Sequence, residues 1–183
     1  GETLDREGSP SRVEWLDAVD LPRVPIEVAA TGPKVIDLAA RRADQICFAV
    51  GADPARLIES MNRARGTAEA AGRGPDALRF GAYVNCVVNE DRDVAREAIR
   101  GGLSVFAHFS GFHGMDIDAL PEQTRGPAQH LREAYDMADH ARSAGAHAQA
   151  LDADFIHTFG IAGPADEALA RLEEIKACLL YTS

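Results

Sequence analysis

The stretch that decides the fold of this chain is Val24-Pro-Ile-Glu-Val-Ala-Ala-Thr-Gly-Pro-Lys-Val-Ile-Asp-Leu-Ala-Ala-Arg-Arg-Ala-Asp-Gln-Ile-Cys-Phe-Ala-Val-Gly51. Residues 24–30 predict a strand, with proline near its beginning, where a missing N–H is tolerated. Pro33 suits the first position of a helix, and residues 35–40 place apolar side chains at helical spacing. Residues 45–50 are a second apolar run and predict a second strand. A strand, a helix and a strand in this order predict two parallel strands joined by a right-handed crossover.

The same alternation continues along the chain. Asp53 and Pro54 are expected to cap and open a second helix, which runs through about Ala71. Residues 80–88 are apolar on both faces, as in a buried parallel strand, and predict a third strand. Residues 92–109 then predict a helix. The order β-α-β-α-β followed by helices indicates an α/β fold with a parallel sheet.

The flanking regions are less regular. We expect loops over residues 1–24 and 110–124, because both are broken by Gly and Pro or by polar side chains. Three strands cannot close a barrel, so we expect an open sheet edge and further strands upstream of this stretch. Three more helices are predicted after the second loop, at residues 126–143, 152–159 and 163–176.

The turn between the first strand and its helix is the best candidate for chemistry. Unpaired N–H groups and the positive end of the helix dipole suit an anion, above all a phosphate, at this edge of a parallel sheet. Gly32 allows a close backbone approach, Thr31 adds a hydroxyl and Lys34 adds a positive charge. Ala30 and Ala49, at the two strand ends, should lie beside them. The alternative is that Gly-Pro simply begins a helix, as at Gly126-Pro127 and Gly163-Pro164, where no strand is predicted before the pair.

Composition excludes several classes of function. The chain has 183 residues, 46% hydrophobic and 26% charged, with a formal net charge of −10. An acidic surface argues against nucleic acid or an anionic membrane as partner. No apolar run is long enough to span a bilayer, no signal peptide is visible, and the three cysteines form no C-x-x-C pair. We therefore expect a cytoplasmic protein. The histidines show no metal-ligand spacing, and no metal is expected.

The quoted stretch resembles the late β-α-β unit of the luciferase-like monooxygenases, in particular their coenzyme F420-dependent members. Residues 79–91 resemble the next strand of that family, and residues 155–174, with Gly160-Ile-Ala-Gly-Pro-Ala-Asp-Glu, resemble its terminal region. The resemblance covers about residues 22–176. It implies a partial (β/α)8 TIM barrel, namely a C-terminal half with parallel strands and a helical C-terminal region. Residues 1–176 would form this part, and residues 177–183 are interpreted as a non-native tail.

The resemblance also implies a function. Members bind F420 or FMN at the carboxyl mouth of the barrel, commonly form homodimers, and pass a hydride to or from a small organic substrate or activate oxygen. The family's phosphate-tail contacts fall on Thr31, Gly32 and Lys34. The early strands that hold the cofactor ring and the usual acid/base have no counterpart here, so the catalytic residues are unknown and we expect this stretch alone to be inactive. The alternatives are a non-catalytic phosphate-ligand-binding or dimerisation module, and another α/β enzyme that binds a nucleotide.

Three residues are candidates for the substrate pocket. Asn85 stands in an otherwise apolar strand, and either faces the barrel mouth or satisfies a backbone group. His108 and His113 belong to the aromatic-rich stretch 106–114, which in the resembling proteins lies over the mouth. Each histidine could bond to substrate or carry a proton. The simpler interpretation is that they lie at a helix C-terminus, where a cation is favoured.

Overall fold

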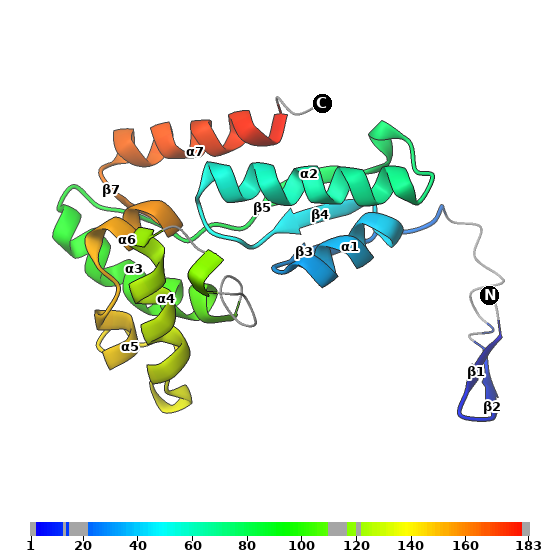
Figure 1. Cartoon of the computed structure of the whole chain (residues 1–183), viewed down its shortest axis with the longest axis horizontal. Coiled ribbons are helices and arrows are strands. Elements are labelled where there is room, and N and C mark those ends of the chain that lie inside the picture. The colour runs from blue at the N-terminus through cyan, green and yellow to red at the C-terminus, as the bar shows by residue number, and fades with distance from the viewer. Residues whose placement is uncertain (1–2, 13, 15–21, 110–116, 120–121, 181–183) are drawn as a thin grey trace.

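The chain is built around a 3-stranded parallel sheet in the order β3-β4-β5 (Figure 1). The strands are β3 (Glu27–Ala30), β4 (Gln45–Phe48) and β5 (Arg79–Ala82), and the crossovers are α1 (Pro33–Arg42) and α2 (Pro54–Ala70). This confirms the predicted β-α-β-α-β order and the parallel sheet. The computed structural model describes residues 3–12, 14, 22–109, 117–119 and 122–180.

The predicted strand over residues 80–88 is divided into two in the structure. Its first part is β5, which pairs with β4, and its second part is β6 (Cys86–Val88), which pairs in parallel with β7 (Ile161–Gly163). The ladder changes partner because β4 ends while the chain continues: the N–H of Tyr83 still donates to Phe48 at 2.8 Å, but the carbonyl of Asn85 accepts from Ile161 at 3.0 Å. Strand β7 was not predicted.

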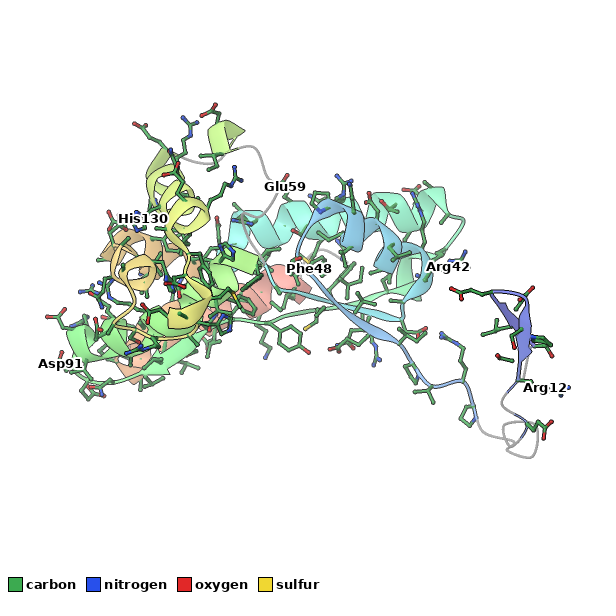
Figure 2. All side chains as sticks on the ribbon, turned by 90° about the horizontal axis from the view of Figure 1, so that it is seen from below. Arg12, Arg42, Phe48, Glu59, Asp91 and His130 are labelled. Atoms are coloured by element: carbon green, nitrogen blue, oxygen red, sulfur yellow. The ribbon has the colours of Figure 1, made fainter. Side chains whose placement is uncertain are left out.

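The helices after the sheet form most of the rest of the structure. Asp91 caps α3 (Arg92–Ala107) and Asp152 caps α6 (Ala153–Phe159) by accepting backbone N–H bonds, as expected for a helix N-cap. We call α3 to α6 the helical lobe. Figure 2 shows Asp91 and His130 in this lobe, at the end of the molecule away from Arg42. The helices are α3 (Arg92–Ala107), α4 (Glu122–Ala134), α5 (Ala146–Gln149), α6 (Ala153–Phe159) and α7 (Ala165–Leu180), with short 3-10 turns η2 (Pro75–Ala77), η4 (Ile117–Ala119) and η5 (Met137–Asp139).

The expected helix from Gly126-Pro127 to Ser143 is wrong at both ends. Helix α4 begins before that pair, which leaves Pro127 inside it, and it ends at Ala134. Asp136 then accepts the N–H of Ala138 at 2.8 Å and turns the chain into η5. A short polar side chain that bonds to the backbone two residues on favours a turn over a continuing helix.

The predictions for Gly163-Pro164, for the end of the last helix and for the first loop also need correction. Gly163-Pro164 does follow a strand, β7, before α7. Helix α7 continues to Leu180, four residues beyond the predicted end. In the predicted first loop, residues 4–11 form an antiparallel hairpin of β1 (Leu4–Arg6) and β2 (Ser9–Ser11). Its turn residues Glu7 and Gly8 have φ of 54° and 81°, the positive values that a two-residue hairpin turn requires.

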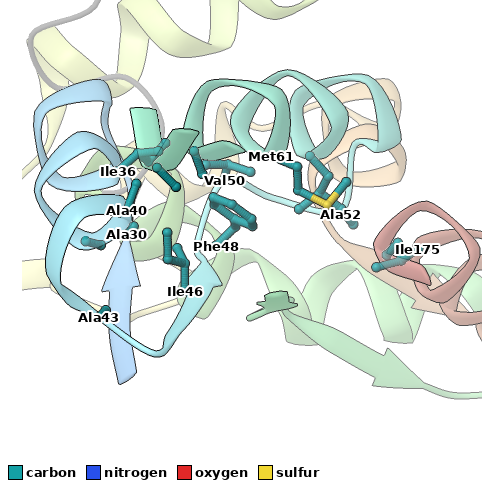
Figure 3. Close-up of a cluster of buried hydrophobic side chains, with 14 of the residues drawn as sticks. Ala30, Ile36, Ala40, Ala43, Ile46, Phe48, Val50, Ala52, Met61 and Ile175 are labelled. Atoms are coloured by element: carbon teal, nitrogen blue, oxygen red, sulfur yellow. The ribbon is translucent and has the colours of Figure 1, made fainter. Parts of the chain in front are cut away.

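The outer face of the 3-stranded sheet is the main core. Alternate side chains of each strand point to the crossover helices, and Ala30, Ile46 and Phe48 are fully buried there (Figure 3). Phe48 stacks on Phe80 with 5.6 Å between ring centroids. Ile175 of α7 closes the same cluster. A second cluster joins α3, α4 and α6 around Leu103, Leu131 and Phe155. Among the described residues, no helix is long and apolar enough to cross a membrane.

The inner face of the sheet carries polar and small side chains. Glu27 accepts hydrogen bonds from Gln45 and from the hydroxyl of Tyr83, the latter at 2.9 Å. The bond to Glu27 raises the pKa of Tyr83. Gly81 has no side chain, and a Cβ built there would lie 3.0 Å from the sulfur of Cys47. The thiol therefore occupies the space that a side chain at position 81 would need.

Arg73 closes the end of α1. Its guanidinium donates to the carbonyls of Ala40 and Ala43 at 2.6 Å and to that of Ala77 at 2.8 Å. The last carbonyls of a helix have no partner within the helix, so a cation that bonds to them satisfies the terminus and complements the dipole.

We expect Arg73→Met to lower the free energy of unfolding by about 1–3 kcal/mol, because charged hydrogen bonds to part-buried carbonyls are lost. Urea denaturation followed by circular dichroism measures the change. The control is Arg79→Met, at an exposed position of β5, which should change stability by less than about 0.5 kcal/mol. Equal effects of the two substitutions would show that the three carbonyl bonds contribute nothing.

Candidate functional site

The amino terminus of α1 lies directly after the carboxyl end of β3 and has no side-chain cap. Gly32 is extended at the N-cap (φ −128°, ψ 166°), and no acidic residue lies in the first turn. Its carbonyl accepts from Val35 at 3.1 Å and Ile36 at 3.0 Å. By contrast, the side chains of Asp53 and Asp91 cap α2 and α3. Pro33 has no N–H, and Val35 and Ile36 donate to the Gly32 carbonyl, so the N–H groups of Gly32 and Lys34 are the donors at this turn without an acceptor among the described residues. No carboxylate neutralises the positive end of the dipole.

The space in front of these amides is open. A Cβ built at Gly32 would meet no atom within 4 Å. Thr31 and Gly32 are half-buried, and Lys34 is exposed. In the part of the chain that the structure describes, Lys34 forms no ion pair. A hydroxyl, the amides of Gly32 and Lys34 and a lysine side chain around an open turn suit an anion with several oxygens.

Ala30 and Ala49 bring the two strand ends together. The N–H of Ala49 donates to the carbonyl of Ala30 at 2.9 Å. Both residues are buried, with 0% and 4% of their surface exposed. Their side chains are thus enclosed, and they fix the position of the turn. The structure places all five predicted cofactor-binding residues, Ala30, Thr31, Gly32, Lys34 and Ala49, at the ends of two adjacent strands.

A contact that the sequence did not reveal joins this edge to the helical lobe. Gly51 has φ +93°, and a Cβ built on it would lie 2.6 Å from the ring of Phe159 in α6. The N–H of Ala52 donates to the carbonyl of Phe159 at 2.9 Å. Gly51 is thus needed for both its backbone conformation and its lack of a side chain. The glycine after a strand was the only sequence signal, and nothing in the sequence identified Phe159 as its partner.

Arg56, in the first turn of α2, is a second cation near this edge. Its guanidinium lies over the ring of Phe159, 5.4 Å from the centroid. Burial lowers the pKa of Arg56, and the charges of Asp53 and Glu59 oppose that effect. A cavity of about 10 Å³ lies beside it, the size of a single water molecule. It is lined by Asp53, Arg56, Thr124, Phe155, Thr158 and Phe159.

The predicted substrate residues lie in the helical lobe or beyond the described residues. The Oδ1 of Asn85 is 3.2 Å from where a Cβ at Gly102 of α3 would be, and its Nδ2 is buried without a hydrogen-bond partner among the described residues. His108 packs against α4: its Nδ1 is 3.1 Å from the carbonyl of Leu131. Since a carbonyl only accepts, Nδ1 carries the hydrogen. His113 lies outside the described residues, so these roles stay predictions.

The sequence profile of the luciferase-like monooxygenases matches residues 1–182. The chain belongs to this family. It is 29% identical over 157 residues to a 5,10-methylenetetrahydromethanopterin reductase of Archaeoglobus fulgidus, covering 83% of this chain and 45% of that protein. This membership confirms the resemblance inferred from residues 22–176.

Two solved structures share the fold. One is a coenzyme F420-dependent tetrahydromethanopterin reductase from Methanopyrus kandleri, with a TM-score of 0.58 and 21% identity over 85% of this chain and 42% of that one. The other is an F420-dependent secondary alcohol dehydrogenase in complex with an F420-acetone adduct, with a TM-score of 0.66 and 19% identity over 97% and 47%. The chain therefore spans about half the length of the relatives it matches.

We expect Gly51→Ala to lower the free energy of unfolding by at least about 2 kcal/mol, because it strains the backbone and overlaps Phe159. The matched control is Gly66→Ala in the middle of α2, where a Cβ meets no atom within 4 Å. That change should stabilise the protein by about 0.5–1 kcal/mol, the usual gain for alanine in a helix. Thermal unfolding of both variants measures the difference, and two alanines of equal effect would contradict the contact.

Proposed function

We propose that this chain forms the part of a deazaflavin- or flavin-dependent oxidoreductase that holds the phosphate-bearing tail of the cofactor. The observation that carries the proposal is the uncapped amino terminus of α1 at the carboxyl end of β3. Family membership supports an oxidoreductase of the luciferase-like class. The chain's own net charge of −10 does not oppose a negative ligand, because the field at this turn is set by the local amides and Lys34.

Coenzyme F420 is the favoured cofactor, with FMN as the alternative. The reductase and the alcohol dehydrogenase that share the fold are both described as F420-dependent. A cofactor of this class accepts or donates the hydride when bound, and the protein supplies position and polarity. We propose an organic small molecule as the other partner in the transfer.

Each residue of the turn has a separate task in this proposal. The N–H groups of Gly32 and Lys34 and the hydroxyl of Thr31 would donate hydrogen bonds to phosphate oxygens, and the ammonium of Lys34 would supply the balancing charge. The bond between Ala30 and Ala49 keeps the neighbouring strand end in register. The contact of Phe159 with Gly51 holds α6 against the same edge.

The test is Gly32→Asp, which introduces an N-cap carboxylate at a position with room for it. Asp at an N-cap stabilises a helix, so the variant should fold, yet its charge should repel a phosphate and occupy the free amides. We expect affinity for F420 or FMN to fall at least about tenfold, and Lys34→Met to lower it about threefold to tenfold. Cofactor fluorescence titrated against the chain measures both.

Two controls make the result specific. Lys176→Met removes the other lysine, on α7, and should leave binding unchanged. Riboflavin, which has the ring without the phosphate, should bind Gly32→Asp and the parent chain equally. If FMN and F420 bind Gly32→Asp as tightly as the parent, or bind neither protein, the assignment of this turn fails. Binding of inorganic phosphate at the turn without any preference for the two cofactors would favour a non-catalytic phosphate-binding module.

A further inference from the structure

A cluster of aromatic and imidazole rings lies between the ends of α3 and α4. Tyr135 is at its centre. The ring of His108 stacks on that of Tyr135 with 4.0 Å between centroids and 15° between planes, and His147 lies 4.4 Å away at 36°. The hydroxyl of Tyr135 is 2.8 Å from Nδ1 of His140. No group of three or more metal-ligating side chains is found in the ranges the structure describes, so the cluster does not have the arrangement of a metal site.

His147 is the residue of this cluster that is enclosed. Only 1% of its surface is exposed, and its Nε2 is buried without a hydrogen-bond partner among the described residues. An imidazolium has two N–H donors, and burying one without an acceptor is costly. Burial accordingly lowers the pKa of His147, while the nearby carboxylates oppose this effect. The charged and titratable groups around it, from the elements packed against α5, are Glu97, Arg100, His108, His130, Tyr135, Asp136, Asp139, His140 and Arg142.

The residues from Tyr135 to His147 form what we call the 135–147 strap, a segment that lies across α3. Its contact with α3 depends on Gly101, where a Cβ would lie 2.3 Å from the carbonyl oxygen of Ala141. Ser143 Oγ accepts the N–H of Gly101 at 3.3 Å, a long bond. Ala141 has φ 63°, which costs about 1–3 kcal/mol for a residue other than glycine. The strap is thus held on α3 by close backbone packing and polar contacts, including a bond from Nε2 of Gln149 to the carbonyl of Ser143 at 2.9 Å, while Ala141 adds local strain.

We propose that the 135–147 strap is an acid-sensitive latch, which is closed on α3 while His147 is neutral and opens when His147 becomes protonated. Opening gives the imidazolium water to donate to, whereas the closed strap gives its Nε2 no acceptor. The ring of His108 stacks on the first residue of the strap, so opening also removes the support behind a predicted substrate-pocket residue. The latch does not depend on cofactor binding at α1.

The sign of the pH dependence follows from the burial of His147. In the open strap its pKa is close to the ordinary 6.5, and in the closed strap it is lower. The open state therefore binds more protons between these two values, and the closed state loses stability as the pH falls below 6.5. One imidazole can shift the opening equilibrium by at most about tenfold per pH unit in this window.

Hydrogen exchange of the whole chain tests the latch. Protection of the Gly145 and Ala148 amides, which bond within the strap region, is compared at about pH 7.5 and about pH 5.5 after correction for intrinsic exchange. We expect protection to fall up to about tenfold at the lower pH, with no change for the buried turns of α2. In His147→Gln the two pH values should give equal protection. His157→Gln, at an exposed position of α6, should behave like the parent chain.

A second measurement needs no substitution. An NMR titration of the His147 ring in the parent chain should give a midpoint below 6.5, and strap protection should fall as the pH decreases from 6.5 toward that midpoint. A midpoint at or above the ordinary value, protection that does not change with pH, or the same acid loss in His147→Gln would overturn the proposal. If His147→Gln fails to fold, the parent chain decides the question: protection should fall between pH 6.5 and the ring midpoint and stay constant above that range.

Discussion

The parallel pairing of β3, β4 and β5 is the constraint on which the rest of the structure depends. Parallel neighbours need a crossover, and the apolar outer face around Phe48 needs a cover, so α1 and α2 satisfy both demands at once. Strands β3 and β4 therefore end at the same edge, and each is followed directly by a helix amino terminus. The site at Thr31-Gly32 is a consequence of this pairing, because the position of β3 in the sheet fixes where α1 begins.

What distinguishes α1 from α2 is the residue before the helix. Asp53 bonds to the first turn of α2 and neutralises it, whereas Gly32 leaves the equivalent turn of α1 uncapped. Two neighbouring strand ends of the same sheet therefore differ in what they can bind. The connection of Phe159 to Gly51 then places the helical lobe against this edge through a ring, a backbone bond and the guanidinium of Arg56. These contacts join the carboxyl edge of the sheet to the helical lobe.

The sequence predicted the features that depend on short-range physics. Hydrophobic periodicity located β3, α1, β4 and α2, and Asp53-Pro54 located the start of α2 within one residue. The sequence did not predict which distant residues pair or pack with one another. The division of residues 80–88 is set by where β4 ends and β7 begins, which no local pattern encodes. Pro127 misled because a Gly-Pro pair is only a local preference, which the tertiary packing of α4 overrides. The rings around Tyr135 come from three separate elements, so their meeting left no spacing to detect.

The inner face of the sheet limits how this chain can diverge. Cys47 fits only because position 81 lacks a side chain, and the register of β4 and β5 sets the two residues directly opposite each other. A larger side chain at position 81 therefore requires a smaller one at position 47. The effects of substitutions at these two positions on the free energy of unfolding should not be additive. In a set of related chains, these two sites should change together: an alanine in place of Gly81 should accompany a smaller residue in place of Cys47.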